Sequence, residues 1–363
     1  MKKMLKKLAL LTVVLLVMSS LVVGCGNTSE PKKAEGDKAT NAPSPSKELQ
    51  TVKVAFDNAP SEAGIILGDK LGFFEEQGIK IEYVKFNSGA DELTAIASNQ
   101  VDVSRGIINA GLFNAANRGI GIKLVADGGH NIPGKGYFQI ALKKGLGAKV
   151  KDYKDLKGLK IAIASIGSIN ELFVQKALEK GGLTAKDVKF VVVDSFPDML
   201  TAVANGSADA TMQIEPLITK GVDDGILEWW KDPDEYAKGE QISILMYSPE
   251  FVKKPELGKQ FMVGYLKGVR AYNDALVEGN KDQDKIIDIL TKTTFVDKPE
   301  TFKKMKPPGL FPDGDILKAG IASDQKWYMG KNLVKAEANV DQMVDTTYID
   351  YAVSKLGKYQ KPQ

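Results

Sequence analysis

The chain has 363 residues, of which 43% are hydrophobic and 26% charged, and this composition is typical of a globular protein with room for two domains. The formal net charge is +3, but residues 1–24 hold four lysines and no acidic residue, so the other 45 basic and 46 acidic residues nearly balance. This balance argues against a protein that binds nucleic acid or an anionic membrane surface by charge.

The N-terminus has the pattern of a bacterial lipoprotein signal. The basic start MKKMLKK precedes an apolar run at residues 8–23, which is short for a membrane span and ends at small residues. Cys25 follows, and it is the only cysteine, so an intrachain disulfide is excluded. The spacing favours lipidation of Cys25 over an ordinary free thiol. We expect residues 1–24 to be a signal peptide and the lipid on Cys25 to hold the protein on the extracytoplasmic face of the cell membrane.

Residues 25–50 contain few side chains that could be buried and are rich in Pro, Lys, Glu and Ser. This composition predicts a disordered tether. A flexible chain of this length would hold the folded part roughly 25–30 Å from the membrane.

From residue 51 the chain alternates strands and helices in two similar sections. In the first section we predict strands at 52–56, 79–86, 102–104, 122–126 and 137–142, and helices at 61–71, 90–98 and 109–117. In the second we predict strands at 159–164, 188–193 and 208–212, and helices at 168–180, 197–204 and 216–221. A further strand is predicted at 241–247, followed by helices near 255–278, 283–292, 313–330 and 341–356.

The two sections are related by an offset of 107 residues. Residues 81–104 align without a gap over residues 188–211, and eight of the 24 positions are identical. Each copy has a strand, a polar turn, a helix and a short strand, which is a βαβ unit with a right-handed crossover. The repeat therefore predicts two lobes that are built alike.

The predicted architecture is a bilobal α/β protein in which parallel-type sheets of the two lobes are joined by a two-strand hinge. The strands near residues 140 and 244 are expected to cross between the lobes. We expect lobe 1 to comprise residues 51–140 and 245–363, and lobe 2 to comprise residues 141–244. Ligands of open parallel sheets bind beyond the carboxyl ends of the strands, and here two such edges would face each other.

Several short motifs resemble those of one family. They are Leu71-Gly72-Phe73-Phe74, Gly78-Ile79, Ser88-Gly89, Asn99-Gln100-Val101-Asp102, Asp155-Leu156-Lys157-Gly158, Gly167-Ser168, Asp209-Ala210 and Glu215-Pro216. In order and spacing they resemble the nitrate/sulfonate/taurine-type solute-binding proteins of ABC importers, a group that includes binders of thiamine-pyrimidine precursors.

The resemblance implies a type II periplasmic-binding-protein fold over residues 51–355. It also implies a small solute captured between the lobes and passed to an ABC permease whose ATPase lies on the cytoplasmic side. We expect a monomer that contacts the membrane only through its lipid anchor and binds no nucleic acid.

The repeat predicts the binding site independently, because loops at matched strand ends should face each other. The candidate residues are Asp57, Asn58, Ser61, Ser88, Gly89 and Arg105 from the first lobe, and Ser165, Gly167, Ser168, Asp194, Gln213 and Glu215 from the second. Ser88-Gly89 and Gly167-Ser168 each precede a helix, whose N-terminus favours an anionic or acceptor-rich ligand. The alternative is that these serines only cap their own helices.

Arg105, Glu215 and a further candidate, His130, each have more than one interpretation. Arg105 could bind a carboxylate, sulfonate or nitrate, or it could form a structural ion pair. If Arg105 binds the ligand, an Arg105→Ala variant should lose an anionic ligand and fold normally. Glu215 could accept an N–H of a ligand, or it could cap a helix, lie at the hinge or hold Arg105. His130, the only histidine, could contact the ligand or lie exposed in the Gly-rich loop 128–136.

The sequence lacks the patterns of an enzyme. One histidine and one lipid-bound cysteine form no nucleophile–base pair, and neither metal-ligand spacing nor a Gly-rich phosphate loop is present. We therefore expect no catalytic residue, no cofactor and no metal. The expected ligand is a small, anionic organic solute such as a sulfonate, a nitrate-like anion or an aromatic acid. Two alternatives are a thiamine-pyrimidine precursor or other aminopyrimidine, and a sensor that presents its ligand to a membrane receptor.

Overall fold

A computed structural model describes residues 48–86, 89–279, 282–295 and 298–362. The predicted lipidation site Cys25 and the predicted cleft residue Ser88 lie outside these ranges. None of the helices in the described ranges combines the length and the hydropathy that crossing a bilayer requires.

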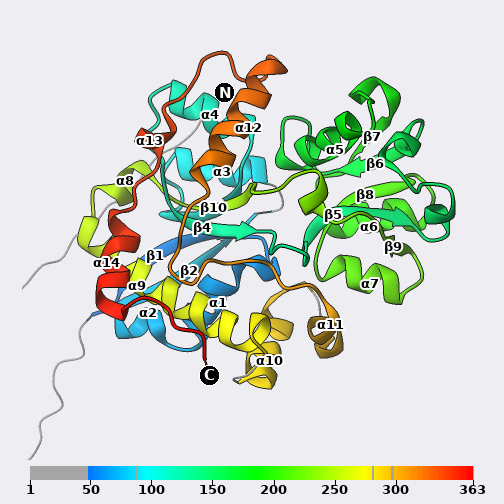
Figure 1. Cartoon of the computed structure of the whole chain (residues 1–363). Helices are drawn as coiled ribbons and strands as arrows, with labels where there is room; N and C mark the ends of the chain where they lie inside the picture. The colour runs from blue at the N-terminus through cyan, green and yellow to red at the C-terminus, as the bar shows by residue number, and fades with distance from the viewer. Residues whose placement is uncertain (1–47, 87–88, 280–281, 296–297, 363) are drawn as a thin grey trace, which may run out of the picture. The chain divides into compact units, whose positions relative to one another are not determined.

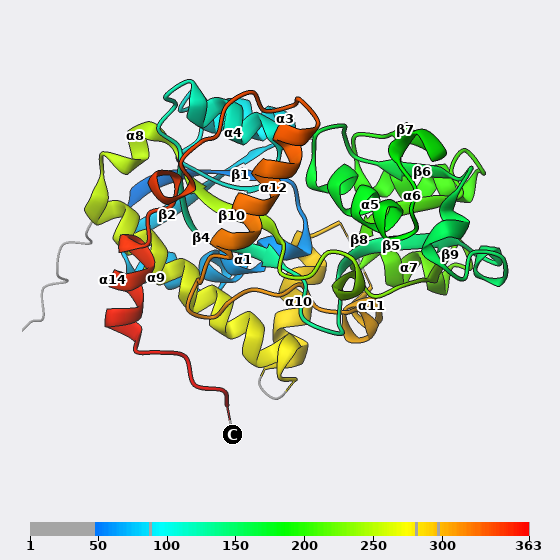
Figure 2. The same cartoon turned by 45° about the horizontal axis from the view of Figure 1, so that its top comes forward.

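The described chain forms two five-stranded mixed sheets, which lie beside each other (Figure 1). The first has the order β2-β1-β3-β10-β4, with β1 (Gln50–Phe56), β2 (Ile79–Lys85), β3 (Val103–Ile107), β4 (Lys123–His130) and β10 (Gln241–Tyr247). The second has the order β7-β6-β8-β5-β9, with β5 (Phe138–Lys143), β6 (Lys160–Ile163), β7 (Lys189–Val192), β8 (Ala210–Ile214) and β9 (Leu227–Trp229). The helices pack on both sheets (Figure 2).

The helices of the repeated sections follow the predicted pattern, except that the short helix at Phe73–Glu76 was not predicted. They are α1 (Ala63–Lys70), α2 (Phe73–Glu76), α3 (Gly89–Ala97) and α4 (Ala110–Asn117) in the first lobe, and α5 (Ile169–Lys180), α6 (Phe196–Ala204) and α7 (Leu217–Asp223) in the second. Short 3₁₀ turns occupy Pro60–Glu62, Leu146–Ala148, Tyr153–Leu156, Ala185–Asp187 and Pro233–Glu235.

The C-terminal part is helical, as the sequence predicts. Its elements are α8 (Pro249–Val252), α9 (Pro255–Tyr272) with the π-helical turn Asn273–Val277, α10 (Gln283–Thr293), α11 (Pro299–Lys304), α12 (Lys318–Gly330), α13 (Val340–Met343) and α14 (Thr347–Leu356). Helix α9 packs against α1, and Gly268 allows this close approach because a Cβ there would overlap the carbonyl oxygen of Gly64. Helix α11, which the sequence did not predict, contacts α7 of the second lobe.

The offset of 107 residues is preserved in space. β1, β2 and β3 pair in parallel in the first sheet, and β6, β7 and β8 occupy the same positions in the second. Each sheet then accepts one antiparallel strand from elsewhere in the chain: β10 pairs with β3, and β5 pairs with β8. The two sheets are therefore mixed, and the predicted repeat is confirmed.

The crossing strands differ in detail from the prediction. β5 lies wholly in the second sheet and β10 wholly in the first, so the chain crosses between the sheets at residues 131–137 and 230–240. The reason is that each strand is paired on both sides within one sheet: β10 lies between β3 and β4, and β5 lies between β8 and β9. A strand paired in this way cannot also bridge two lobes.

A pair of identical aspartates explains part of the repeat. Asp102 accepts a hydrogen bond from the backbone N–H of Lys53 at 2.9 Å, and Asp209 accepts one from the N–H of Lys160 at 2.8 Å. Each carboxylate therefore fixes the start of the third strand of its unit beside the first.

We expect Asp102→Ala and Asp209→Ala each to lower the free energy of unfolding by about 1 kcal/mol, because each leaves a strand N–H without its acceptor. Denaturant unfolding measures this, with the exposed Asp224→Ala as control, which removes only a surface ion pair to Lys220. Unequal losses at Asp102 and Asp209 would contradict equivalent roles.

Candidate functional site

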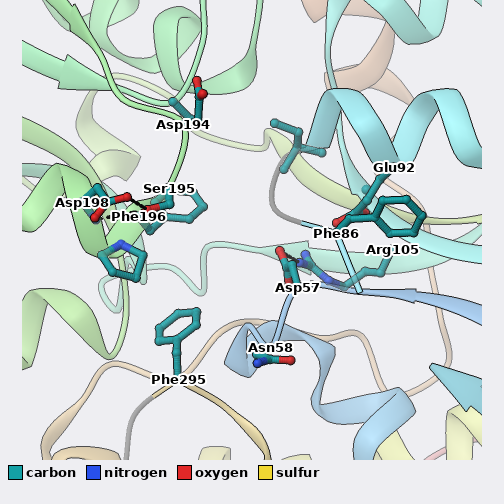
Figure 3. Close-up of a pocket in the computed structure, with 14 residues that line it drawn as sticks. Asp57, Asn58, Phe86, Glu92, Arg105, Asp194, Ser195, Phe196, Asp198 and Phe295 are labelled. Atoms are coloured by element: carbon teal, nitrogen blue, oxygen red, sulfur yellow. Dashed lines mark hydrogen bonds and ion pairs between the residues drawn. The ribbon is translucent and has the colours of Figure 1, made fainter. Parts of the chain in front are cut away.

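A cavity of 510 Å³ lies beyond the carboxyl ends of the strands and is lined from both lobes (Figure 3). We call it the first cavity. Its lining comprises Asp57, Asn58, Phe86, Glu92, Arg105, Gly106 and Ile107 of the first lobe, Ala164 and residues 194–198 of the second, and Phe295 of the C-terminal part. The repeat places these loops opposite each other, as the strand-end rule predicts.

Arg105 lies in β3 at the floor of this cavity and is almost completely buried, with 6% of its surface exposed. Its Nη1 donates to Ser243 Oγ at 2.8 Å, and its Nη2 lies 3.5 Å from Asp57 Oδ2. Burial lowers the pKa of Arg105, but Asp57 and Glu62 oppose this and hold the pKa above its ordinary value. Arg105 therefore remains a cation and is already paired with protein groups.

Two buried glutamates surround the guanidinium. Glu62 and Glu92 are 1% and 4% exposed, and Ser104 Oγ donates to Glu92 Oε2 at 3.1 Å. Burial, followed by repulsion from Asp57, raises the pKa of Glu92 to about 8 and raises that of Glu62 well above its ordinary value. One arginine thus faces three carboxyl groups, so the floor of the cavity carries no excess positive charge.

Three helices with N-termini at the cleft, α3, α5 and α6, have a carboxylate of their own in the first turn, whereas α4 has none. Asp91 and Glu92 lie in the first turn of α3, Glu171 in that of α5 and Asp198 in that of α6. Glu171 accepts from the N–H of Gly167 at 2.7 Å, and Ser195 Oγ donates to Asp198 at 2.6 Å. Because these carboxylates offset the positive ends of the helix dipoles, these three N-termini offer little to an anion.

Three phenylalanines supply the aromatic part of the lining. Phe86 follows β2, Phe196 opens α6 across the cavity, and Phe295 lies below them (Figure 3). The backbone N–H of Phe295 donates to the carbonyl of Asn58 at 3.2 Å, which holds this residue at the cavity. Rings from both lobes can contact a flat ligand on more than one side.

The predicted site residues divide into three groups. Asp57, Asn58, Arg105 and Asp194 line the first cavity. Ser165, Gly167 and Asp194 line a neighbouring space. Four further candidates line neither space. Ser168 donates to the carbonyl of Ser165, and Gln213 donates to the carbonyl of Phe196. Ser61 is buried, and Gly89 is the first residue of α3.

Glu215 and His130 bond to other protein groups. Glu215 accepts from the Thr219 N–H and hydroxyl, both at 2.9 Å, and from the N–H of Lys306, so it caps α7. His130, a predicted ligand contact, does not line the first cavity. The alternative that it lies exposed in a loop is wrong: it ends β4, is 8% exposed, bonds to Asp127 at 2.8 Å and stacks on Phe311. Residues 128–130 of the Gly-rich segment belong to β4 because Gln241 of β10 pairs with His130.

Sequence reasoning missed Phe86, Glu92, Phe196, Asp198 and Phe295. A signal existed for Asp198, since it is one of the identical pairs of the repeat. None existed for Phe295, which reaches the cavity from a segment far along the chain. Among the described residues no group of three or more His, Cys, Asp or Glu side chains could hold a metal ion.

Comparisons with known proteins agree with this architecture. The family profile described as NMT1/THI5 like matches residues 59–274. A Bacillus subtilis protein with the provisional name aliphatic sulfonates-binding protein is 26% identical over 353 residues, covering 94% of this chain and 96% of its own. The 4-amino-5-hydroxymethyl-2-methylpyrimidine phosphate synthase of Schizosaccharomyces pombe is 24% identical over 171 residues, covering 46% of each chain.

The fold matches solved structures as well. The periplasmic aliphatic sulphonate binding protein SsuA of Escherichia coli superposes with a TM-score of 0.66 at 18% identity, covering 82% of this chain and 92% of its own. At this identity the match shows the fold alone. The two-lobed periplasmic-binding-protein fold that the sequence predicts is confirmed.

Proposed function

The chain belongs to the NMT1/THI5-like family, whose profile covers residues 59–274, and from this premise we propose that it is the solute-binding subunit of an ABC importer. It captures one small molecule between its lobes and delivers it to a membrane permease. The relative that aligns over nearly the whole chain is named as a binding protein, whereas the synthase aligns over less than half of it.

The observation that carries this proposal is a cavity lined by matched loops of two lobes. Asp57 and Ala164 follow the equivalent strands β1 and β6, and they lie in loops on opposite sides of it. Phe86 and Asp194 follow the equivalent strands β2 and β7 in the same way. A ligand that contacts both sides stabilises the closed arrangement of the lobes, so binding shifts the population toward the form that a permease can recognise.

We further propose that the ligand is an aromatic solute that donates N–H groups, with an aminopyrimidine as the best example. Asp57, Glu92 and Asp194 offer acceptors, while Arg105, the one cationic side chain among the described residues of the lining, is paired with Asp57. The phenylalanines favour a flat ring. These features favour an aminopyrimidine over the anionic solute suggested by the helix N-termini alone, since those N-termini have carboxylates of their own.

The N-terminal segment fits the same function. Lipidation of Cys25 after removal of residues 1–24 would hold the protein at the extracytoplasmic membrane surface, and residues 25–50 would let the lobes reach a permease. Globomycin, which blocks lipoprotein signal cleavage, is expected to leave the larger precursor in cells.

A thermal-shift screen tests the ligand class. We expect 4-aminopyrimidine at one hundred times its Kd to stabilise the native state by about 2.7 kcal/mol, and ethanesulfonate, nitrate and benzoate to have little effect. Phe295→Ala should weaken binding of the aminopyrimidine, and Phe311→Ala, which removes a ring stacked on His130 away from the cavity, should not.

Stabilisation by ethanesulfonate or nitrate, without any by 4-aminopyrimidine, would overturn the proposed ligand class and leave the binding function in place. Uptake of the ligand by cells that carry or lack the gene distinguishes import from sensing. Normal uptake without the gene would overturn the importer role.

A further inference from the structure

A second cavity of 710 Å³ adjoins the first. The two share Ile107, Ala164 and Asp194 in their linings, so they are parts of one continuous cleft. The second cavity is the larger of the two. A single aromatic ring held by Asp57 and Phe295 in the first cavity would leave the second one without solute.

The walls of the second cavity carry apolar side chains from three separate segments. Leu93 comes from α3, Ile166 from the loop after β6 and Leu333 from the segment after α12. Ile166 is 53% exposed, which is high for a large aliphatic side chain. Apolar surface of this kind gains free energy when a ligand removes it from water.

The two lobes are already in contact at one wall of the second cavity, so closure of the lobes cannot bring them closer together there. The N–H of Ala110 donates to the carbonyl of Gly167 at 3.0 Å, and Asn109 and Ser168 form an antiparallel bridge. A Cβ placed on Gly167 would lie 3.5 Å from Leu333 and 3.7 Å from Ala110, which is ordinary van der Waals distance. The two lobes are therefore packed against each other at this wall. The second cavity therefore persists as a space for part of the ligand.

We propose that the second cavity binds an apolar substituent of the solute, so that the natural ligand is amphiphilic. Its N–H-bearing ring occupies the first cavity, and a short alkyl chain or second ring contacts Leu93, Ile166 and Leu333. This inference rests on the proposed function for the position of the ring.

Calorimetry with matched pairs of short and extended probes tests the proposal. The pairs are 4-aminopyrimidine with 4-amino-2-butylpyrimidine, ethylamine with hexylamine, and ethanesulfonate with hexanesulfonate. For the head group that binds, we expect each buried methylene to tighten binding up to about fourfold. Ile166→Ser and Leu333→Ser should reduce this gain and leave the affinity for the short probe unchanged.

Val192→Ser is the matched control, because Val192 is an aliphatic side chain of the same lobe, 51% exposed, outside both linings. This variant should keep the full gain. Equal affinities for short and extended probes would overturn the second site while leaving the proposed function intact. A gain that survives both serine variants would also overturn it.

If no head group binds, the proposed ligand class fails, and 1-hexanol then tests the second cavity by itself. Saturation-transfer NMR should show contact between 1-hexanol and the wild-type protein that Ile166→Ser and Leu333→Ser remove. Absence of that contact in the wild-type protein would overturn the inference.

Discussion

Replacement of Arg105 by methionine is expected to lower the free energy of unfolding by about 3–5 kcal/mol. Methionine fills a similar volume, but it leaves the buried Glu62 and Glu92 and the half-buried Asp57 without their shared cation. Guanidinium unfolding measures the loss. The effect is large because the desolvated carboxyl groups cannot recover the interaction from water. Arg105 is thus structural as well as part of the lining, and the expectation that Arg105→Ala folds normally should fail.

A second substitution separates charge from packing. Glu92→Gln in the Arg105→Met background removes one of the buried acids, so it should restore part of the lost stability. Arg118→Met provides the control: Arg118 is exposed at the end of α4, and its loss should cost no more than about 1 kcal/mol. Equal losses for Arg105→Met and Arg118→Met would show that Arg105 does not hold the carboxyl cluster.

The fold could be predicted because its information is local and repeated. The two βαβ units have the same strand and helix spacing, and their identical aspartates make the same backbone bond. The end of β4 could not be predicted in this way. Its pairing partner Gln241 lies 111 residues further along the chain than His130, and no local pattern encodes such a pair.

The candidate site was predictable to the level of loops and no further. Asp57, Asn58, Arg105 and Asp194 lie where strand ends must face each other. The net charge of the cavity lining depends instead on which helix side chains point into the cavity. Glu92 of α3 does so, and a single buried glutamate in an otherwise amphipathic helix has no distinguishing pattern. Because the lining has no excess positive charge, the expected ligand changes from an anion to an N–H donor.

The affinity for 4-aminopyrimidine is expected to rise with pH between about 6.5 and 9. Burial and the neighbouring Asp57 raise the pKa of Glu92 to about 8, so below pH 8 this carboxyl group holds a proton. An N–H donor binds better to the carboxylate, so binding releases that proton. Affinity therefore increases by up to about tenfold per pH unit below 8 and levels off above it. The ring nitrogen of the probe titrates below this range.

An anionic ligand would give the opposite slope. Ethanesulfonate keeps its charge throughout this range, and ionisation of Glu92 would repel it, so its affinity would fall as pH rises through 8. Calorimetry at several pH values, in buffers of different ionisation enthalpy, measures both the slope and the number of protons released. The sign of the slope thus identifies the ligand class independently of the thermal-shift screen.

Two variants assign the slope to Glu92. Glu92→Gln has no titrating group at this position, so its affinity should not change over the range. Asp324→Asn is the matched control: Asp324 is fully buried in α12, burial raises its pKa to about 8 as well, and it lies outside both linings. This variant should keep the wild-type slope. A flat wild-type profile, or a slope that Asp324→Asn abolishes and Glu92→Gln retains, would exclude Glu92 as the acceptor of the ligand's N–H group.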